Sequence, residues 1–335
     1  MAIPQIAMDQ EPTIFLTDGM RGANGYAAMM KSLASRAFPL LVLAASSASP
    51  LLAGEAESTP AIAPAAAPSK VNVLFQLDVS DHYITPRGLN VENEGVIFQP
   101  LLLAFVNLYS SDTGFVDNVS LTAGMWSSIH SEKSGADPGR WNEFDPILGL
   151  TVKFADIFKF DTTYTAFDSM VDSYPTSHHL ELKLSLDDSK WLGPWALNPY
   201  VAYWQELENK ATVVFNPLTS EESFYFTIGI NPSAKIGPVK LEFPTFMNIV
   251  ADDFYQQFNG TGGGSGIAVV STGIKASVPI TFIPEGYGHW TWYAGVKYYH
   301  LSNDGLEDGN LVLTPGGDHD EDNLFQFHTG ITAFF

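Results

Sequence analysis

From residue 71 to the last residue of the chain, apolar and polar side chains alternate with a period of two. In the segment 179–186, for example, a leucine occupies every second position. The intervening positions are His179, Glu181, Lys183 and Ser185. Alternation of this kind gives a strand one apolar and one polar face. The chain beyond residue 70 is therefore predicted to consist of β-strands that each face two different environments.

About twelve such segments follow one another, separated by turn-forming residues. They are 71–84, 95–109, 117–129, 143–154, 156–169, 177–187, 198–208, 221–231, 236–249, 266–282, 288–302 and 323–335. With a periplasmic amino terminus, the outer connections include the long segments 130–142, 209–220, 250–265 and 303–322. The inner connections are mostly short. Long outer loops and short periplasmic turns are typical of barrels in the bacterial outer membrane.

The length of the strands and the low charge favour a membrane barrel over other folds. The expected strands span 11 to 17 residues, whereas strands of soluble proteins average about 5 or 6. Only 16% of the residues are charged, below the roughly 25% of soluble domains. After residue 60 there is no apolar run of about 18 residues, which a spanning helix requires. We predict an all-β fold, a transmembrane antiparallel up-and-down barrel of about 12 strands, in a Gram-negative outer membrane. A soluble β-sandwich is the competing fold.

The amino-terminal region predicts export. Residues 1–53 contain a short positive region at Lys31 and Arg36, followed by an apolar run that is rich in small residues. This layout is typical of a signal peptide, and Met30 is a possible true start. The alternative, a single membrane anchor, is disfavoured because the run is short and contains Ser and Pro. Cleavage after Ala48, Ala53 or Ala56 fits equally well.

Two further regions follow the signal-peptide region. Residues 54–70 are rich in Ala and Pro and are expected to form an extended periplasmic linker. Residues 71–335 are expected to form the barrel. The alternating last strand ends in Phe335, which resembles the carboxy-terminal signal that the barrel assembly machinery recognises.

Composition excludes several classes of partner and site. The chain has no cysteine, so disulfides, thiolate metal sites and cysteine nucleophiles are excluded. A formal net charge of −21 argues against nucleic acid as a partner, because phosphate binding requires basic surface. The expected partners are outer-membrane lipid and lipopolysaccharide, the assembly machinery and small solutes. No cofactor and no metal are implied.

Three short motifs resemble a known family. Ser80-Asp81-His82-Tyr83 precedes Arg87-Gly88, and the segment 124–128 reads Gly-Met-Trp-Ser-Ser. This pattern resembles the TorF-type outer-membrane porins over about the first quarter of the barrel. The spacing from Tyr83 to Arg87 is one residue longer than that family usually shows. The resemblance implies a porin-like role.

The polar faces of the strands carry charges that would point into the barrel. The predicted pore-lining residues are Lys153, Lys159, Asp161, Glu181, Lys183, Lys240, Glu242, Lys275 and Lys297. One interpretation is a charged lumen that passes small hydrophilic solutes by diffusion, with mild anion selectivity. The other is an interior cross-braced by ion pairs, because a barrel of 12 strands lies between filled and open barrels. The second interpretation leaves the protein a closed structural or adhesive barrel.

A second hypothesis is a lipid-modifying hydrolase. His300 and Ser302 lie two residues apart on the expected lipid-facing side of a strand. The segment resembles the catalytic stretch of lipid A deacylases, in which a His activates a Ser. Glu307 or Asp304 would orient the His. The alternative is a His in an aromatic girdle followed by an ordinary turn, which we favour. The acidic segment Asp318–Asp322 is interpreted as a solvated loop in preference to a Ca²⁺ site.

Overall fold

The computed structural model describes residues 71–210, 212, 222–257, 260–313 and 322–335 of the chain. The predicted signal-peptide region and linker, residues 1–53 and 54–70, lie outside this part. No helix in the described part is long and apolar enough to cross a membrane.

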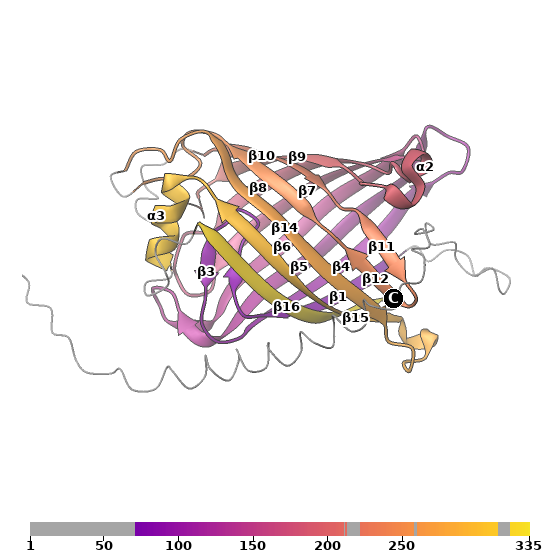
Figure 1. Cartoon of the computed structure of the whole chain (residues 1–335), viewed down its shortest axis with the longest axis horizontal. Helices are drawn as coiled ribbons and strands as arrows, with labels where there is room; N and C mark the ends of the chain where they lie inside the picture. The colour runs from indigo at the N-terminus through magenta and orange to yellow at the C-terminus, as the bar shows by residue number, and fades with distance from the viewer. Residues whose placement is uncertain (1–70, 211, 213–221, 258–259, 314–321) are drawn as a thin grey trace, which may run out of the picture. The chain divides into compact units, whose positions relative to one another are not determined.

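Antiparallel strands close into a barrel with twelve strand positions (Figure 1). Neighbours in sequence pair with each other, and the first strand pairs with the last, as at Leu77 and Ile331. Ten positions are single strands: β1 (Val71–Ser80), β4 (Ile97–Ser110), β5 (Val116–Ser134), β6 (Gly139–Phe154), β7 (Phe158–Ser169), β8 (Ser177–Leu186), β9 (Tyr200–Glu208), β14 (Gly266–Pro279), β15 (His289–Leu301) and β16 (Asn323–Phe334). The predicted barrel of about 12 antiparallel strands is therefore confirmed.

Prolines divide the remaining two positions. One consists of β10 (Phe224–Ile230) and β11 (Ser233–Ile236), and the next of β12 (Val239–Glu242) and β13 (Thr245–Val250). The pairings β10–β13 and β11–β12 share one register, and the N–H of Phe243 donates to the carbonyl of Pro232 between them, at 2.9 Å. Proline has no N–H to donate to a ladder. Pro232 and Pro244 therefore interrupt strands that otherwise run the full height of the wall.

Short helices mark the two ends of the barrel (Figure 1). At one end, α2 (Ser189–Leu192) and η1 (Gly193–Trp195) join β8 to β9, and η2 (Glu285–Tyr287) joins β14 to β15. At the other end, α3 (Asp304–Leu313) follows β15. We call these the α2 end and the α3 end. The sequence predicted only a loop with a turn where α3 lies.

The helix α3 forms because its start is capped. The side-chain oxygen of Asn303 accepts hydrogen bonds from the N–H groups of Gly305 and Leu306, both at 3.1 Å. Such a cap satisfies backbone donors that the first turn leaves free. Leu306 is fully buried against the barrel interior, which holds the helix over the α3 end.

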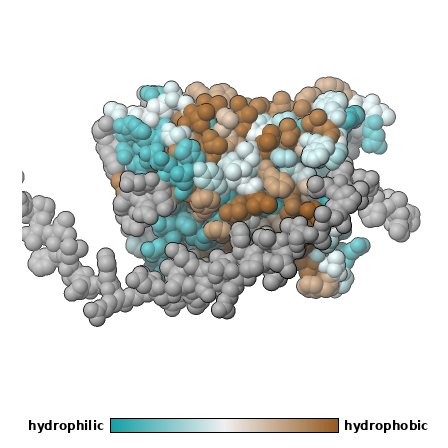
Figure 2. Space-filling model, in the orientation of Figure 1, coloured by the Kyte–Doolittle hydropathy of each residue, from teal (hydrophilic) through white to brown (hydrophobic). Residues whose placement is uncertain are grey.

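The outer face of the wall is apolar. Outward-facing Leu148, Val201 and Phe327 are 50–54% exposed. Figure 2 shows apolar residues gathered across the middle of one face and hydrophilic residues gathered toward the α3 end. Apolar surface of this extent is unfavourable in water and marks a face that contacts something apolar.

The connection between β1 and β4 folds into the barrel instead of continuing the wall. The sequence predicted a strand over 71–84, but β1 ends at Ser80, which is paired directly with Ile97 of β4. The intervening residues 81–96, which we call the inner hairpin, contain β2 (Tyr83–Ile84) paired with β3 (Asn90–Glu92). Figure 1 places β3 within the α3 end.

A hydrophobic core fills the interior of the α3 end. The inner hairpin contributes Ile84 and Leu89, and the wall contributes residues such as Phe167, Trp204 and Val269. All five are less than 10% exposed. The described interior is thus packed at the α3 end, and its cavities lie nearer the α2 end.

Candidate functional site: a plugged lumen

A tight turn presents Arg87 at the tip of the inner hairpin. The N–H of Gly88 donates to the carbonyl of Thr85 at 2.9 Å, with Pro86 in the second position of the turn, where its fixed φ fits. Gly88 has a φ of +85°, and a Cβ there would lie 2.9 Å from each of Leu301, Leu306 and Val269. Only glycine fits this position, because the backbone is left-handed and the surroundings are packed.

The Arg87 guanidinium lies in an aromatic setting. Its central carbon is 4.8 Å from the ring centre of Phe167 and 5.1 Å from that of Trp204. His179 stacks between these rings, with its centre 4.1 Å from Phe167 and 4.4 Å from Trp204. Arg87 is 7% exposed. Cation–π contacts of this geometry are strongest when the cation is shielded from water.

Acidic and phenolic groups complete the surroundings of the inner hairpin. The Tyr83 hydroxyl donates to Oε2 of Glu143 on β6 at 2.7 Å. Burial, and then the nearby Glu143 carboxylate, raise the pKa of Tyr83 well above its ordinary value, so the hydroxyl keeps its proton. Arg87 is close enough to Glu143 for electrostatic attraction. A buried cation is thereby balanced by a buried carboxylate, which limits the cost of removing both from water.

Hydrogen bonds tie the backbone of the inner hairpin to two strands of the wall and to one connection. Asn248 of β13 donates to the carbonyl of Pro86 at 2.8 Å, and Gln326 of β16 donates to the carbonyl of His82 at 2.7 Å. The Tyr255 hydroxyl donates to the carbonyl of Arg87. Asn248 and Gln326 lie on strands three positions apart, whereas Glu143, which accepts from Tyr83, lies on β6 at the other side of the barrel. The inner hairpin is therefore held from both sides of the lumen.

The base of the inner hairpin is held by a series of contacts between three buried polar side chains. Oε2 of Glu92 lies 3.5 Å from Nδ1 of His130, and Nε2 of His130 lies 2.9 Å from Oγ of Ser128. All three residues are less than 10% exposed. These contacts link β3 to β5 and fix the point at which the inner hairpin enters the lumen.

The predicted pore-lining residues of β6, β7 and β8 share one side of the wall. The strand pairing places Lys153 opposite Lys159 and Asp161 opposite Lys183. Glu181 is the next residue on the same face of β8, nearer the α3 end than Lys183. Nζ of Lys159 lies 2.9 Å from Asp161. Nζ of Lys183 lies 4.1 Å from the ring centre of Tyr200 on β9.

Two cavities lie along this side. One, of about 500 Å³, lies at the α2 end and includes Lys153 and Lys159. The other, of about 100 Å³, is lined by Glu181, Lys183 and Pro86, so the inner hairpin closes it toward the α3 end.

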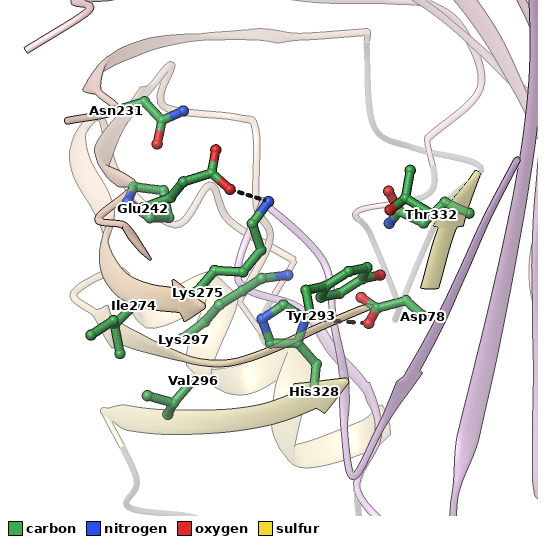
Figure 3. Close-up of a pocket in the computed structure, with 12 residues that line it drawn as sticks. Asp78, Asn231, Glu242, Ile274, Lys275, Tyr293, Val296, Lys297, His328 and Thr332 are labelled. Carbon is green, nitrogen blue, oxygen red and sulfur yellow. Dashed lines mark hydrogen bonds and ion pairs between the residues drawn. The ribbon is translucent and has the colours of Figure 1, made fainter. Parts of the chain in front are cut away.

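The remaining predicted pore-lining residues lie on the other side. Glu242 of β12 lies 3.3 Å from Nζ of Lys240 and 2.8 Å from Nζ of Lys275 on β14. Lys297 of β15 lines the same cavity as Lys275 and Glu242, which has a volume of about 250 Å³ (Figure 3). The structure therefore gathers the predicted charges into two groups on facing sides of the lumen.

The contacts of the candidate hydrolase residues do not form a nucleophile–base pair. Oγ of Ser302 donates to the carbonyl of Ile267 at 2.8 Å, and Nδ1 of His300 lies 3.2 Å from Oδ1 of Asn323. Glu307 belongs to α3, where partial burial and then the neighbouring acid Asp322 raise its pKa. A Ser nucleophile requires a hydrogen bond to its base, and these two side chains have other partners.

Metal-binding hypotheses gain no support within the described residues. No group of three or more His, Asp or Glu side chains there could hold a metal ion. Of the acidic segment, residues 318–321 lie outside the described part. His178 and His179 face opposite sides: His178 contacts the Tyr164 hydroxyl at 2.7 Å, while His179 lies among the inner rings.

The sequence reasoning missed the residues that close the lumen. Arg87 and Tyr83 entered only through a family resemblance, and Glu143 was not singled out. One signal was available. A connection of this length between two strands that pair directly, with a Pro-Arg-Gly turn at its centre, exceeds what a hairpin loop requires.

Comparison with known proteins gave matches only among solved structures. No protein-family model and no curated protein matches the chain, so the TorF-type resemblance stays a prediction. An outer membrane channel from Pseudomonas putida F1 aligns at a TM-score of 0.42 and 10% identity, over 82% of this chain and 100% of that chain. The translocator domain of the autotransporter NalP from Neisseria meningitidis aligns at 0.38 and 13% identity, over 80% and 89% of the two chains. OccAB1 from Acinetobacter baumannii aligns at 0.30 and 10% identity, over 79% and 96%.

Proposed function

We propose that the protein is an outer-membrane channel for small hydrophilic solutes, with the α3 end outside the cell and the α2 end in the periplasm. The apolar outer face would contact lipid, where a closed barrel satisfies every strand edge. The observation that carries the proposal is the polar lumen below the inner hairpin, with charged side chains lining cavities on facing sides.

The inner hairpin is the barrier in this channel. Its side chains and backbone are bonded across the lumen, so a solute passes only while the hairpin is displaced. Flow would then be passive diffusion through a gated path. The cavities on this path are lined by Lys153, Lys159, Lys183, Lys275 and Lys297, to which we attribute a mild preference for anions.

The test is a recording of the refolded full barrel in a planar bilayer with a KCl gradient. We expect conductance steps whose reversal potential lies closer to the equilibrium potential of chloride than to that of potassium. A reversal potential closer to the equilibrium potential of potassium would contradict anion preference. The direction of insertion is read separately, from proteolysis of the α2-end and α3-end connections in whole cells.

A closed structural barrel is the second candidate, because one observation favours it. The core at the α3 end is packed as the interior of a soluble domain is packed, with Ile84, Leu89 and Leu306 less than 5% exposed. The two candidates differ in whether the barrel conducts once the inner hairpin is removed.

A further inference from the structure

The barrel wall surrounds the Arg87 guanidinium with side chains that belong to the wall alone. The strands β6 to β10 are consecutive neighbours (Figure 1), and each contributes one residue. We call this set the wall cage: Glu143, Phe167, His179, Trp204 and Tyr225. All five are less than 10% exposed. The site that holds Arg87 is therefore built by strands to which Arg87 does not belong.

The rings of the wall cage hold one another in place. The His179 ring lies within 18° of parallel to that of Trp204, and the Phe167 ring within 27°. Trp204 also packs against Tyr225, with ring centres 5.1 Å apart, and against Phe254 at 5.8 Å. Aromatic pairs at such distances are stabilising. Because these contacts do not involve the inner hairpin, the rings are expected to keep their positions when Arg87 leaves.

Acidic side chains give the wall cage an attraction for cations. Glu143 and Asp145, both on β6, are 4% and 5% exposed. Both interact electrostatically with Arg87. Removing one member of a buried set of opposite charges leaves the other uncompensated, at a cost in free energy. A wall cage that has lost Arg87 is therefore stabilised by taking up another cation.

The geometry favours a guanidinium over an ammonium group. A guanidinium is planar, stacks on aromatic faces and is more weakly hydrated than an ammonium, so it loses less on entering a buried site. Arg87 demonstrates the fit, because its guanidinium carbon lies 4.8 Å from the ring centre of Phe167 and 5.1 Å from that of Trp204.

We propose that the wall cage is a binding site for the guanidinium group of a small solute, and that Arg87 occupies this site while the inner hairpin lies in the lumen. The solute and Arg87 compete for the same rings and acids, so solute binding favours displacement of the hairpin. Lys153 and Lys159 line a cavity at the α2 end, so the cation site and these lysines lie at different levels of the path. The proposal rests on the proposed function only in that the inner hairpin leaves the lumen.

The experiment measures binding without measuring flow. The refolded full barrel with Arg87→Ala, in detergent micelles, is titrated with methylguanidinium chloride at constant ionic strength. The methyl proton resonance is followed by NMR, because the ring currents of stacked aromatic side chains move it upfield. We expect a saturable upfield shift. Binding to the wild type is expected to be at least about tenfold weaker, because Arg87 fills the wall cage.

A second ligand tests the chemical class, and a second variant guards against misfolding. Methylammonium chloride is expected to bind at least about threefold more weakly than methylguanidinium. A barrel in which a short Gly/Ser turn replaces residues 81–96 exposes the same wall cage without Arg87, and it is expected to bind as Arg87→Ala does. Heat-modifiable migration in gels verifies that each variant folds.

Further variants localise the site. Trp204→Leu, added to Arg87→Ala, is expected to weaken binding at least about threefold. Trp141→Leu in the same background is the matched control, because Trp141 is 48% exposed and lies outside the wall cage. Arg140→Ala alone removes an exposed positive charge from β6 and is expected to bind as the wild type does.

Three outcomes overturn the proposal: no saturable shift in either variant that lacks Arg87, an equal loss in Trp204→Leu and Trp141→Leu, or equal affinity for methylammonium. The last would mean a general attraction for cations. Saturable binding by a barrel that never conducts would leave the site standing and contradict the channel instead. Conductance without binding would do the reverse.

Discussion

The guanidinium carbon of Arg87 lies 4.8 Å from the ring centre of Phe167, although Arg87 belongs to a connection and Phe167 to the wall. The contact closes the lumen at the level where β7, β8 and β9 bring Phe167, His179 and Trp204 together. It also makes Arg87 the side chain whose removal most directly weakens the attachment of the inner hairpin.

Replacing Arg87 by Ala is expected to increase the time that the proposed channel spends open. The variant loses two shielded cation–π contacts, each of about 2 kcal/mol, and removes the electrostatic attraction between Arg87 and Glu143. An increase of at least about tenfold in the open fraction follows, since 1.4 kcal/mol corresponds to a factor of about ten. Single-channel recordings give the open fraction.

The matched control for this variant is Arg140→Ala, which removes the same charge from an exposed position on β6. We expect it to behave as the wild type. If the open fraction of Arg87→Ala equals that of Arg140→Ala, the guanidinium does not hold the hairpin.

Replacing Tyr83 by Phe should destabilise the barrel. The change removes the donor that Glu143 accepts at 2.7 Å and leaves a buried carboxylate short of a hydrogen bond. The expected loss is about 1–3 kcal/mol of the free energy of unfolding, measured by urea titration in lipid vesicles. Tyr109→Phe, at a residue 48% exposed, is the control. Equal stability of the two variants would refute the buried bond.

Acid should loosen the base of the inner hairpin through Glu92. Burial alone would raise the pKa of Glu92, but the hydrogen bond with His130 and those from the N–H groups of Glu94 and Asn93 outweigh it, so the pKa is lowered from 4.5. A carboxyl group whose pKa is lower in the folded state stabilises that state above its ordinary pKa. That stabilisation disappears as the pH falls through the folded pKa, below 4.5.

The measurement compares unfolding of the wild type and Glu92→Gln between about pH 6 and about pH 3. The wild type is expected to be the more stable at the upper end, and the difference should vanish at the lower end. Glu94→Gln, an exposed neighbour, should show no such convergence. A difference that grows toward low pH would have the wrong sign for this account.

Reversing the charge at Lys183 should shift ion selectivity. Lys183 lines the cavity directly below Pro86, on one side of the proposed path. Lys183→Glu is expected to move the reversal potential in a KCl gradient toward that of potassium. Lys133→Glu, the same change at an exposed position near the end of β5, should leave it unmoved. Identical reversal potentials in the two variants would place the selectivity elsewhere.

The wall was predictable from sequence because alternation is a local property. The alternation within a strand, as in 179–186, identifies its polar face by itself. The twelve strands and the inward direction of Lys183 and Glu181 could therefore be predicted without knowing which strands are neighbours. The pairing of Glu242 with Lys275 was not predictable in the same way, because it depends on the register between two strands.

The inner hairpin was not predictable because its burial exists only once the barrel has closed. The alternating pattern of β1 breaks at Asp81, which falls on the apolar phase, but the expected strand was extended across it to residue 84. The break comes from contacts distant in sequence: Oδ1 of Asp81 accepts from the N–H of Phe327 at 2.9 Å, and Gln326 binds the carbonyl of His82. The helix α3 depends similarly on packing of Leu306 against Gly88.

The most direct test of the central claim removes the inner hairpin. Ser80 and Ile97 are paired, so a four-residue Gly/Ser turn in place of residues 81–96 should join β1 to β4 without disturbing the wall. Single-channel conductance of this variant is compared with that of the intact barrel. We expect long-lived open steps where the intact barrel opens only briefly. A folded variant that conducts no more than the intact barrel would contradict the claim that the inner hairpin closes a channel.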